Sequence, residues 1–182
     1  MTKIQTAALA ASALVGLVLL RSRPPEPTPP TPPQSGTPPE LDALQRRSLA
    51  MLETLRSEIR PLIVALIRAA YESGISLVVT DAFRSSAEQD RIYEQGRTTP
   101  GPIVTEVRGG SSWHNYGLAA DLAVLAGGQP TWPNDLDLWA RIGAIGKRAG
   151  LRWGGDFPTP DRPHFEFHPP GIGPGISPPP IA

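Results

Sequence analysis

The chain has 182 residues and carries 17 basic and 17 acidic side chains, so its formal net charge at neutral pH is zero. This balance gives no sign of a basic surface for nucleic acid, and we expect no nucleic-acid partner. The chain has no cysteine, which excludes a disulfide framework and a thiolate metal site. Its 23 prolines gather towards the two ends. The composition therefore predicts one ordered domain between extended flanks.

An apolar segment opens the chain. Residues 4–20 are uncharged and rich in Ala and Leu, with Lys3 before them and Arg21 and Arg23 after them. As a helix the segment would be about 25 Å long, slightly less than the ~30 Å core of a bilayer. It lacks a polar face, which favours membrane insertion over an amphipathic core helix. We predict that residues 1–23 form a membrane anchor or signal segment, whose cleavage and orientation the sequence leaves open.

A proline-rich segment follows the apolar one. Residues 24–39 carry nine prolines in sixteen positions, which favours polyproline II and prevents a packed core. At about 3.1 Å per residue, this linker would reach up to about 50 Å. We interpret it as a spacer between membrane and domain, and a docking site for a proline-binding domain is the alternative reading.

The rest of the chain carries helix and strand patterns in one domain. Apolar residues at helical spacing predict a helix from Glu40 that ends or restarts at Pro61, and a second helix that stops before Gly74. The other expected elements are a strand at 75–80, a helix capped by Ser85 or Ser86 and ended by Gly96, a short strand at 103–107, a strand at 118–125, a helix from Asn134 or Asp135 to Ala149, a strand and turn at 153–157, and a strand at 164–168. Together they predict an α+β domain at 40–170, with a small, mainly antiparallel sheet covered by helices, followed by a Pro- and Gly-rich tail at 171–182.

Two short segments, 111–121 and 161–168, hold all three histidines of the chain. In the first, Asp121 is the one charged residue in the apolar run 118–125. A carboxylate in such a strand is costly unless it is paired or bound to a cation. The residues two positions away on the same face are alanines, which leave room beside the carboxylate. This pattern predicts a compact bound group.

The second segment repeats the pattern. In a strand at 164–168, His164, Glu166 and His168 share one face while the two phenylalanines between them face a core. Imidazole and carboxylate groups without thiolate suit zinc with a position left open for water. From spacing alone, an Asp121 paired with an arginine beside hydrogen-bonded histidines remains the alternative.

Two longer motifs surround these residues. The pattern S-x-H-x-x-G-x-A-x-D runs from Ser112 to Asp121, and W-G-G-D-F followed by D-x-P-H-F-E spans 153–157 and 161–166. These motifs resemble those of the zinc peptidases that cut peptidoglycan stem peptides. The family comprises D-alanyl-D-alanine dipeptidases and carboxypeptidases and L-alanyl-D-glutamate endopeptidases, the latter including many phage endolysins. The W-G-G-D-F element resembles the endopeptidases most. The resemblance covers roughly residues 75–168.

The resemblance implies a zinc ion held by His114, Asp121 and His164, with motif position alone choosing Asp121 over the third histidine. It implies that Asp161, three residues before a ligand histidine, is the catalytic acid or base, and that Arg84 faces the zinc. A turn-capping role for Asp161 and a surface ion pair for Arg84 are the alternatives. The further candidates, which would orient ligands or line the site, are Ser112, Trp153, Glu166 and His168.

These expectations define an endolysin-like, zinc-dependent peptidoglycan peptidase of hedgehog/DD-peptidase-like fold that hydrolyses the L-alanyl-D-glutamate bond of the stem peptide. One alternative is a D-alanyl-D-alanine carboxypeptidase or dipeptidase. Another is a non-catalytic, zinc-stabilised wall-binding module, because a related domain of animal hedgehog proteins is regarded as non-catalytic. Asp161 weighs against this last reading. We expect a monomer, exported or anchored through residues 4–20, that acts in the periplasm or cell wall.

Overall fold

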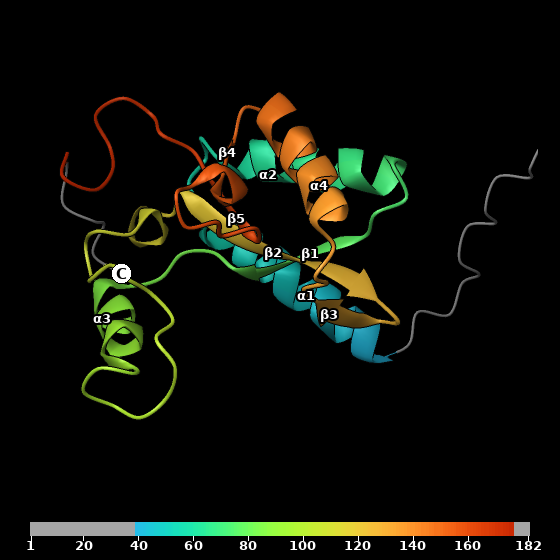
Figure 1. Ribbon diagram of the computed structural model, residues 1–182. Helices are drawn as coiled ribbons and strands as arrows, with labels where there is room; N and C mark the ends of the chain where they lie inside the picture. Colours follow the sequence, from blue (N-terminus) through green and yellow to red (C-terminus); the bar gives the residue numbers. More distant parts are fainter. Residues whose placement is uncertain (1–38, 177–182) are drawn as a thin grey trace, which may run out of the picture. The chain divides into compact units, whose positions relative to one another are not determined.

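The computed structural model describes residues 39–176 of the chain (Figure 1). The predicted anchor at 4–20, nearly all of the predicted linker and the end of the predicted tail lie outside these residues. In the described part, no helix combines the length and the apolar character that crossing a bilayer requires. The predictions for the N-terminal segments therefore stay predictions.

Between residues 39 and 176 the chain forms α-helices, short 3₁₀ helices and one small sheet. In chain order the elements are α1 (Pro39–Thr54), α2 (Arg60–Glu72), β1 (Leu77–Asp81), α3 (Ser86–Glu94), η1 (Trp113–Tyr116), β2 (Ala119–Ala126), β3 (Gln129–Thr131), α4 (Leu136–Arg148), β4 (Arg152–Trp153), η2 (Gly154–Asp156) and β5 (His164–Glu166). This arrangement confirms the predicted α+β class with a small antiparallel sheet.

Helix starts follow the predicted capping residues. The Ser85 hydroxyl accepts a hydrogen bond from the Glu88 amide at the start of α3, and the Asp135 carboxylate accepts one from the Leu138 amide at the start of α4. Pro61 lies in the first turn of α2, where its missing N–H has no intrahelical partner to lose. The first predicted helix nevertheless ends earlier than expected, at Thr54.

The predicted strand at 103–107 is absent, and these residues form a loop. The side-chain amide of the buried Gln89 donates hydrogen bonds to the Thr105 hydroxyl and to the Val107 carbonyl. A side chain thus holds this segment in place of a neighbouring strand. The predicted strand at 164–168 is also shorter, because two prolines that cannot donate to a ladder follow His168.

The sheet has the order β1-β2-β5-β4, with β3 paired to β2, and all pairings are antiparallel. Side chains alternate between the faces of the central strand β2. Leu118, just before the strand, and then Ala120 and Leu122 are fully buried in the hydrophobic core, together with Phe165 of β5. Asp121 therefore points to the opposite face.

Helices α2 and α4 pack over the apolar face of the sheet (Figure 1). Ile63 of α2 and Ile142 of α4 are fully buried there. Helix α1 lies beside β1, where the Ser48 hydroxyl accepts a hydrogen bond of 2.9 Å from the Val79 amide. The helices thus cover one face and one edge of the sheet, and Asp121 lies on the other face, in the lining of a cleft.

Candidate metal centre

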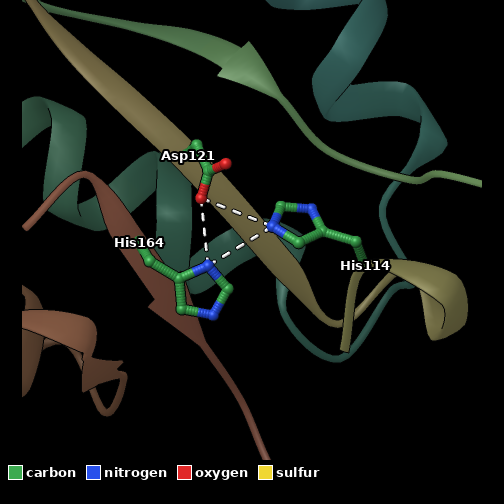
Figure 2. A group of neighbouring side chains, drawn as sticks. All are labelled: His114, Asp121 and His164. Carbon is green, nitrogen blue, oxygen red and sulfur yellow. Dashed lines mark hydrogen bonds and ion pairs between the residues drawn. The ribbon is translucent and has the colours of Figure 1, made fainter. Parts of the chain in front are cut away.

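Three side chains from different elements converge on one point of the sheet face that carries Asp121 (Figure 2). His114 comes from η1, Asp121 from β2 and His164 from β5. The Nε2 atom of His114 lies 3.3 Å from Nδ1 of His164 and 3.3 Å from Oδ1 of Asp121. The remaining distance, from Nδ1 of His164 to Oδ1 of Asp121, is 3.0 Å.

Local backbone structure brings these three residues together. Asp121 and His164 are direct partners in the β2–β5 ladder, so their side chains leave the same face side by side. His114 sits in η1, where the Ser112 hydroxyl accepts a hydrogen bond from its amide. Gly117 ends η1 with a φ of 63°, a conformation that a residue with a Cβ rarely adopts. The chain then enters β2 at once.

The outer nitrogen of each histidine ring has a partner that fixes the tautomer. Nδ1 of His114 lies 2.6 Å from the Ala82 carbonyl oxygen, which can only accept, so this nitrogen carries the proton. Nε2 of His164 lies 3.1 Å from a carboxylate oxygen of Glu166 and donates to it. Nε2 of His114 and Nδ1 of His164 are thereby the nitrogens that face the centre, as in many histidine metal sites.

The three inward atoms match the geometry of a zinc site. At metal–ligand distances of about 2.0–2.1 Å, two ligands of a tetrahedral zinc lie about 3.3 Å apart. The observed separations of 3.0, 3.3 and 3.3 Å fit one face of such a tetrahedron. Three lone pairs aimed at one point would repel one another, so either a proton or a metal cation must lie between these atoms. The residues therefore fit a three-ligand zinc site with its fourth position open.

The charges around the centre favour a cation there. Burial alone would raise the pKa of Asp121, but the rings of His114 and His164 outweigh that effect and hold its pKa well below the ordinary value. Burial would lower the pKa of His164, yet its hydrogen bonds to Asp121 and Glu166 raise this pKa to about 10. The metal-free centre thus holds a proton on His164, which must leave when a metal binds.

Asp161 lies beside the ligands in the turn that precedes β5. The His164 amide donates to the Asp161 carbonyl at 3.2 Å, and the Asp161 amide donates to the Gly154 carbonyl at 2.9 Å. A Cβ on Gly154 would overlap this turn, which explains the glycine in the W-G-G-D-F motif. Desolvation of the carboxyl group and repulsion by Asp121 raise the pKa of Asp161. Its carboxyl group thus lies close enough to the centre to sense the Asp121 charge.

Arg84 lies in the loop between β1 and α3, and its guanidinium group has two partners. It forms an ion pair with Asp81 and donates a hydrogen bond of 2.7 Å to the side chain of Gln89. Its backbone amide donates to the carbonyl of His114. Arg84 thus forms an ion pair, as the alternative interpretation expected, but its side chain is only 15% exposed. The ion pair holds the guanidinium group in the lining of the same cleft as the ligands.

A cleft of about 820 Å³ opens over the metal centre. Loop residues 103–107 and 157–161 line it together with the three ligands and Arg84. Ile103 and Val104 are more than half exposed there, 53% and 58%. The cleft is large enough for several residues of a peptide, and the ligands lie in its wall.

The remaining candidates take different places. Ser112 lines the cleft and caps η1, and the buried Glu166 holds His164. His168, two residues beyond the end of β5, does not line the cleft but donates a hydrogen bond to Glu166. Trp153 packs against Gly143 of α4 and is absent from the cleft lining, so the structure brings it to the core side and not to the site.

The sequence reasoning missed three residues around the site. Gln89 connects the loop at 103–107 to Arg84 through the hydrogen bonds described above. Arg152 of β4 donates a hydrogen bond of 2.9 Å to Glu166, its direct partner in the ladder. Trp113 stacks on the ring of His168. No local sequence pattern predicts these contacts, because each one joins two segments that are distant in the sequence.

A three-ligand metal site with an open position, next to a carboxylate and an arginine in a peptide-sized cleft, defines the class of metal-dependent hydrolases. A family model for D-alanyl-D-alanine carboxypeptidase matches residues 105–167. The peptidoglycan L-alanyl-D-glutamate endopeptidase CwlK of Bacillus subtilis strain 168 is 45% identical over 114 residues, which cover 58% of this chain and 68% of that protein.

Solved structures are similar over much of the chain. The L-Ala D-Glu endopeptidase ChiX of Serratia marcescens has a TM-score of 0.49 and 26% identity, over 68% of this chain and 88% of that one. The D,D-pentapeptidase VanY of a VanB-type vancomycin resistance cassette, in complex with Zn(II), has a TM-score of 0.47 and 18% identity, over 62% and 72%.

The chain belongs to the family of zinc peptidases that act on peptidoglycan, as the match to the Bacillus enzyme establishes. It is therefore a metallopeptidase, and zinc is its cofactor. His114, Asp121 and His164 are positioned to hold such an ion. The predicted family and cofactor are thereby confirmed.

Proposed function

We propose that this enzyme hydrolyses the bond between L-alanine and D-glutamate in the peptidoglycan stem peptide. The observation that carries this proposal is the 45% identity to an L-alanyl-D-glutamate endopeptidase over 114 residues, a stretch long enough to include the whole motif-bearing region. The W-G-G-D-F element, whose Gly154 seats the Asp161 turn, supports the same choice.

The runner-up is removal of terminal D-alanine, which the description of the matching family model favours. A soluble stem peptide that contains both bonds distinguishes the two activities by mass spectrometry. The proposed endopeptidase releases the L-alanine end from the D-glutamate end. A product shortened by D-alanine alone would favour the runner-up.

The proposed roles of the site residues follow from their positions. His114, Asp121 and His164 hold the zinc ion, which when bound polarises a peptide carbonyl and lowers the pKa of a water molecule. Asp161 takes the proton from the attacking water and passes it to the departing amine. Burial and the Asp121 charge raise the pKa of Asp161 above its ordinary value, a direction that suits a group which must both accept and donate a proton.

Arg84 is proposed to stabilise the oxyanion that forms on the substrate carbonyl. Its contacts with Asp81 and Gln89 hold the guanidinium group before substrate arrives, so little reorganisation is needed. The side chain is 15% exposed and lies in the cleft lining. A planar group with five donors can keep these contacts and still present an N–H to the substrate.

Arg84→Lys is expected to retain zinc and fold but to lower kcat by about 100- to 1000-fold, the scale of losing one oxyanion donor. Lysine keeps the charge but lacks the planar fork that serves Asp81, Gln89 and substrate at once. Steady-state kinetics on a soluble stem peptide measure the effect, with Arg91→Lys on the exposed side of α3 as control. Near-normal turnover of the Arg84 variant would reject this role.

The domain organisation is also a proposal. An anchor or export segment at 1–23 and a spacer at 24–39 deliver a catalytic domain at 40–170, with a tail at 171–182. The uncharged, Ala- and Leu-rich composition of residues 4–20 supports membrane association. We propose an exported or membrane-anchored monomer that acts in the periplasm or cell wall, since all candidate site residues belong to one chain.

A chain that begins at Glu40 is expected to be soluble, to bind zinc and to digest isolated cell walls at a rate close to that of the full chain. All candidate site residues lie beyond the deleted part. Dye release from labelled walls and turnover of soluble stem peptides provide the two readouts. If the shortened chain binds zinc but leaves soluble stem peptides uncut, the N-terminal segments have a role in catalysis.

A further inference from the structure

Behind the metal centre, one buried carboxylate connects a ligand to two side chains outside the cleft. Glu166 is 4% exposed. Its Oε2 atom accepts from Nε2 of His164, and its Oε1 atom accepts from Arg152 at 2.9 Å and from Nε2 of His168 at 2.8 Å. Both carboxylate oxygens are therefore occupied, which leaves Glu166 as a holder of His164 and not as a free base.

Glu166 is also connected to His114, the other proposed histidine ligand, through His168 and Trp113. The ring of His168 stacks on the indole of Trp113 with 3.6 Å between centroids and 14° between planes. Trp113 directly precedes His114 in η1. A series of side-chain contacts thus runs from His164 through Glu166 and His168 to Trp113, which is the neighbour of His114 in sequence. Protein groups alone make this connection between the two histidines.

The arginine has a distinct part in this series of contacts. A buried carboxylate needs charged or hydrogen-bonded partners, and Arg152 lies opposite Glu166 in the β4–β5 ladder. A guanidinium nitrogen of Arg152 also lies 2.9 Å from Nδ1 and 2.8 Å from Nε2 of His168. Because the carboxylate of Glu166 can only accept, Nε2 of His168 carries the proton that it donates to Glu166, and Nδ1 is the nitrogen to which Arg152 can donate. One guanidinium group thus contacts both partners.

We propose that Arg152, His168 and Trp113 are positioning residues that, through Glu166, hold His164 and His114 in ligand geometry before zinc binds. The inference rests on the proposed ligand set and deepens it. The side chains of Arg152 and His168 are 55% and 32% exposed, but that of Glu166 is only 5% exposed. Loss of one partner of this buried carboxylate lowers folding stability, so the measurement that identifies positioning is the ligand geometry at the metal and not the fold alone.

The experiment measures zinc affinity of the full chain by competition with a chromophoric chelator. Arg152→Met removes the charge but keeps the length, and His168→Phe keeps the stack on Trp113 but removes the hydrogen bond. Each should raise the Kd for zinc by about tenfold or more, the lower end for residues that orient a metal-bound histidine. His168→Gln, which restores an N–H donor for Glu166, should recover part of this loss.

Arg91→Met is the matched control, because its ion pair with Glu88 lies on the exposed side of α3; its Kd should stay within about twofold of wild type. The metal-free Arg152 variant should melt at a lower temperature than metal-free wild type, because the buried Glu166 loses a partner, but it should stay folded at the temperature of the zinc titration. The Co(II)-substituted Arg152 variant should have an altered visible spectrum, which reports ligand geometry without any turnover.

Unchanged zinc affinity in both Arg152→Met and His168→Phe would overturn the proposal. So would a lowered zinc affinity with a Co(II) spectrum identical to that of wild type, since that result means a merely structural contact. His114→Ala distinguishes a failure of the positioning proposal from a failure of the proposed ligand set. If that variant binds zinc like wild type, the ligand set itself is wrong, whatever the other variants do.

Discussion

Asp161→Asn is expected to lower turnover by at least about a hundredfold, the scale of general acid–base catalysis, while zinc content stays at the wild-type level. Asparagine preserves the size of the side chain and much of its turn hydrogen bonding, but it has no basic oxygen. The Asp161 backbone bonds to Gly154 and His164 are untouched by the change. Single-turnover kinetics on a soluble stem peptide measure the effect.

The melting temperature of the same variant shows whether the fold is intact. Burial and Asp121 raise the pKa of Asp161 in the folded, metal-free protein. A carboxyl group with a raised folded pKa destabilises the fold at pH values above its unfolded pKa, because ionisation then favours the unfolded chain. The neutral asparagine should therefore leave the metal-free melting temperature at pH 7 equal or higher, so that a loss of turnover would not reflect unfolding.

Asp156→Asn is the matched control, because this exposed aspartate pairs with Lys147 on the outer surface. It should retain full turnover. If Asp161→Asn cut stem peptides at close to the wild-type rate, Asp161 would not be the base. Glu166 would be a poor replacement, since His164, Arg152 and His168 already occupy its oxygens.

Alanine at any of His114, Asp121 or His164 is expected to abolish both tight zinc binding and activity. The three inward atoms lie within 4.8 Å of one another, so each is positioned to supply a direct bond to an ion. The loss of affinity should exceed the about 10- to 100-fold typical of residues that only orient a ligand. Metal analysis after dialysis against a weak chelator measures the zinc that remains.

His168→Ala and Asp156→Ala are the comparisons for these variants. The former should bind one zinc ion with reduced affinity, because His168 touches Glu166 and not the centre. The latter should be like wild type. A His168 variant without zinc beside an Asp121 variant that keeps it would show that the ligand set chosen from the motif is wrong.

The site could be predicted from sequence because its chemistry is local to two short segments. Asp121 is an isolated charge in an apolar strand, and His164 alternates with a core phenylalanine, so both were expected on the polar face of a sheet. The antiparallel pairing of Asp121 with His164 then follows from strands that bury their other faces in one core. Here pattern and fold agree.

The parts that the sequence did not predict depend on contacts between distant segments. Residues 103–107 are rich in β-branched residues, which favour a strand, yet the side chain of Gln89 binds them as a loop. The contact of Arg152 with Glu166 depends on the β4–β5 register, which the turn seated on Gly154 sets. The stack of Trp113 on His168 joins η1 to the end of the sheet. None of these has a signature within a short window.

The most direct test of the central claim is mass spectrometry of purified peptidoglycan after digestion with the zinc-loaded enzyme. The account predicts fragments with new N-terminal D-glutamate and new C-terminal L-alanine, which disappear when a chelator removes the metal and return when zinc is restored. Fragments that lack only terminal D-alanine, or undigested peptidoglycan beside a fully zinc-loaded protein, would contradict it.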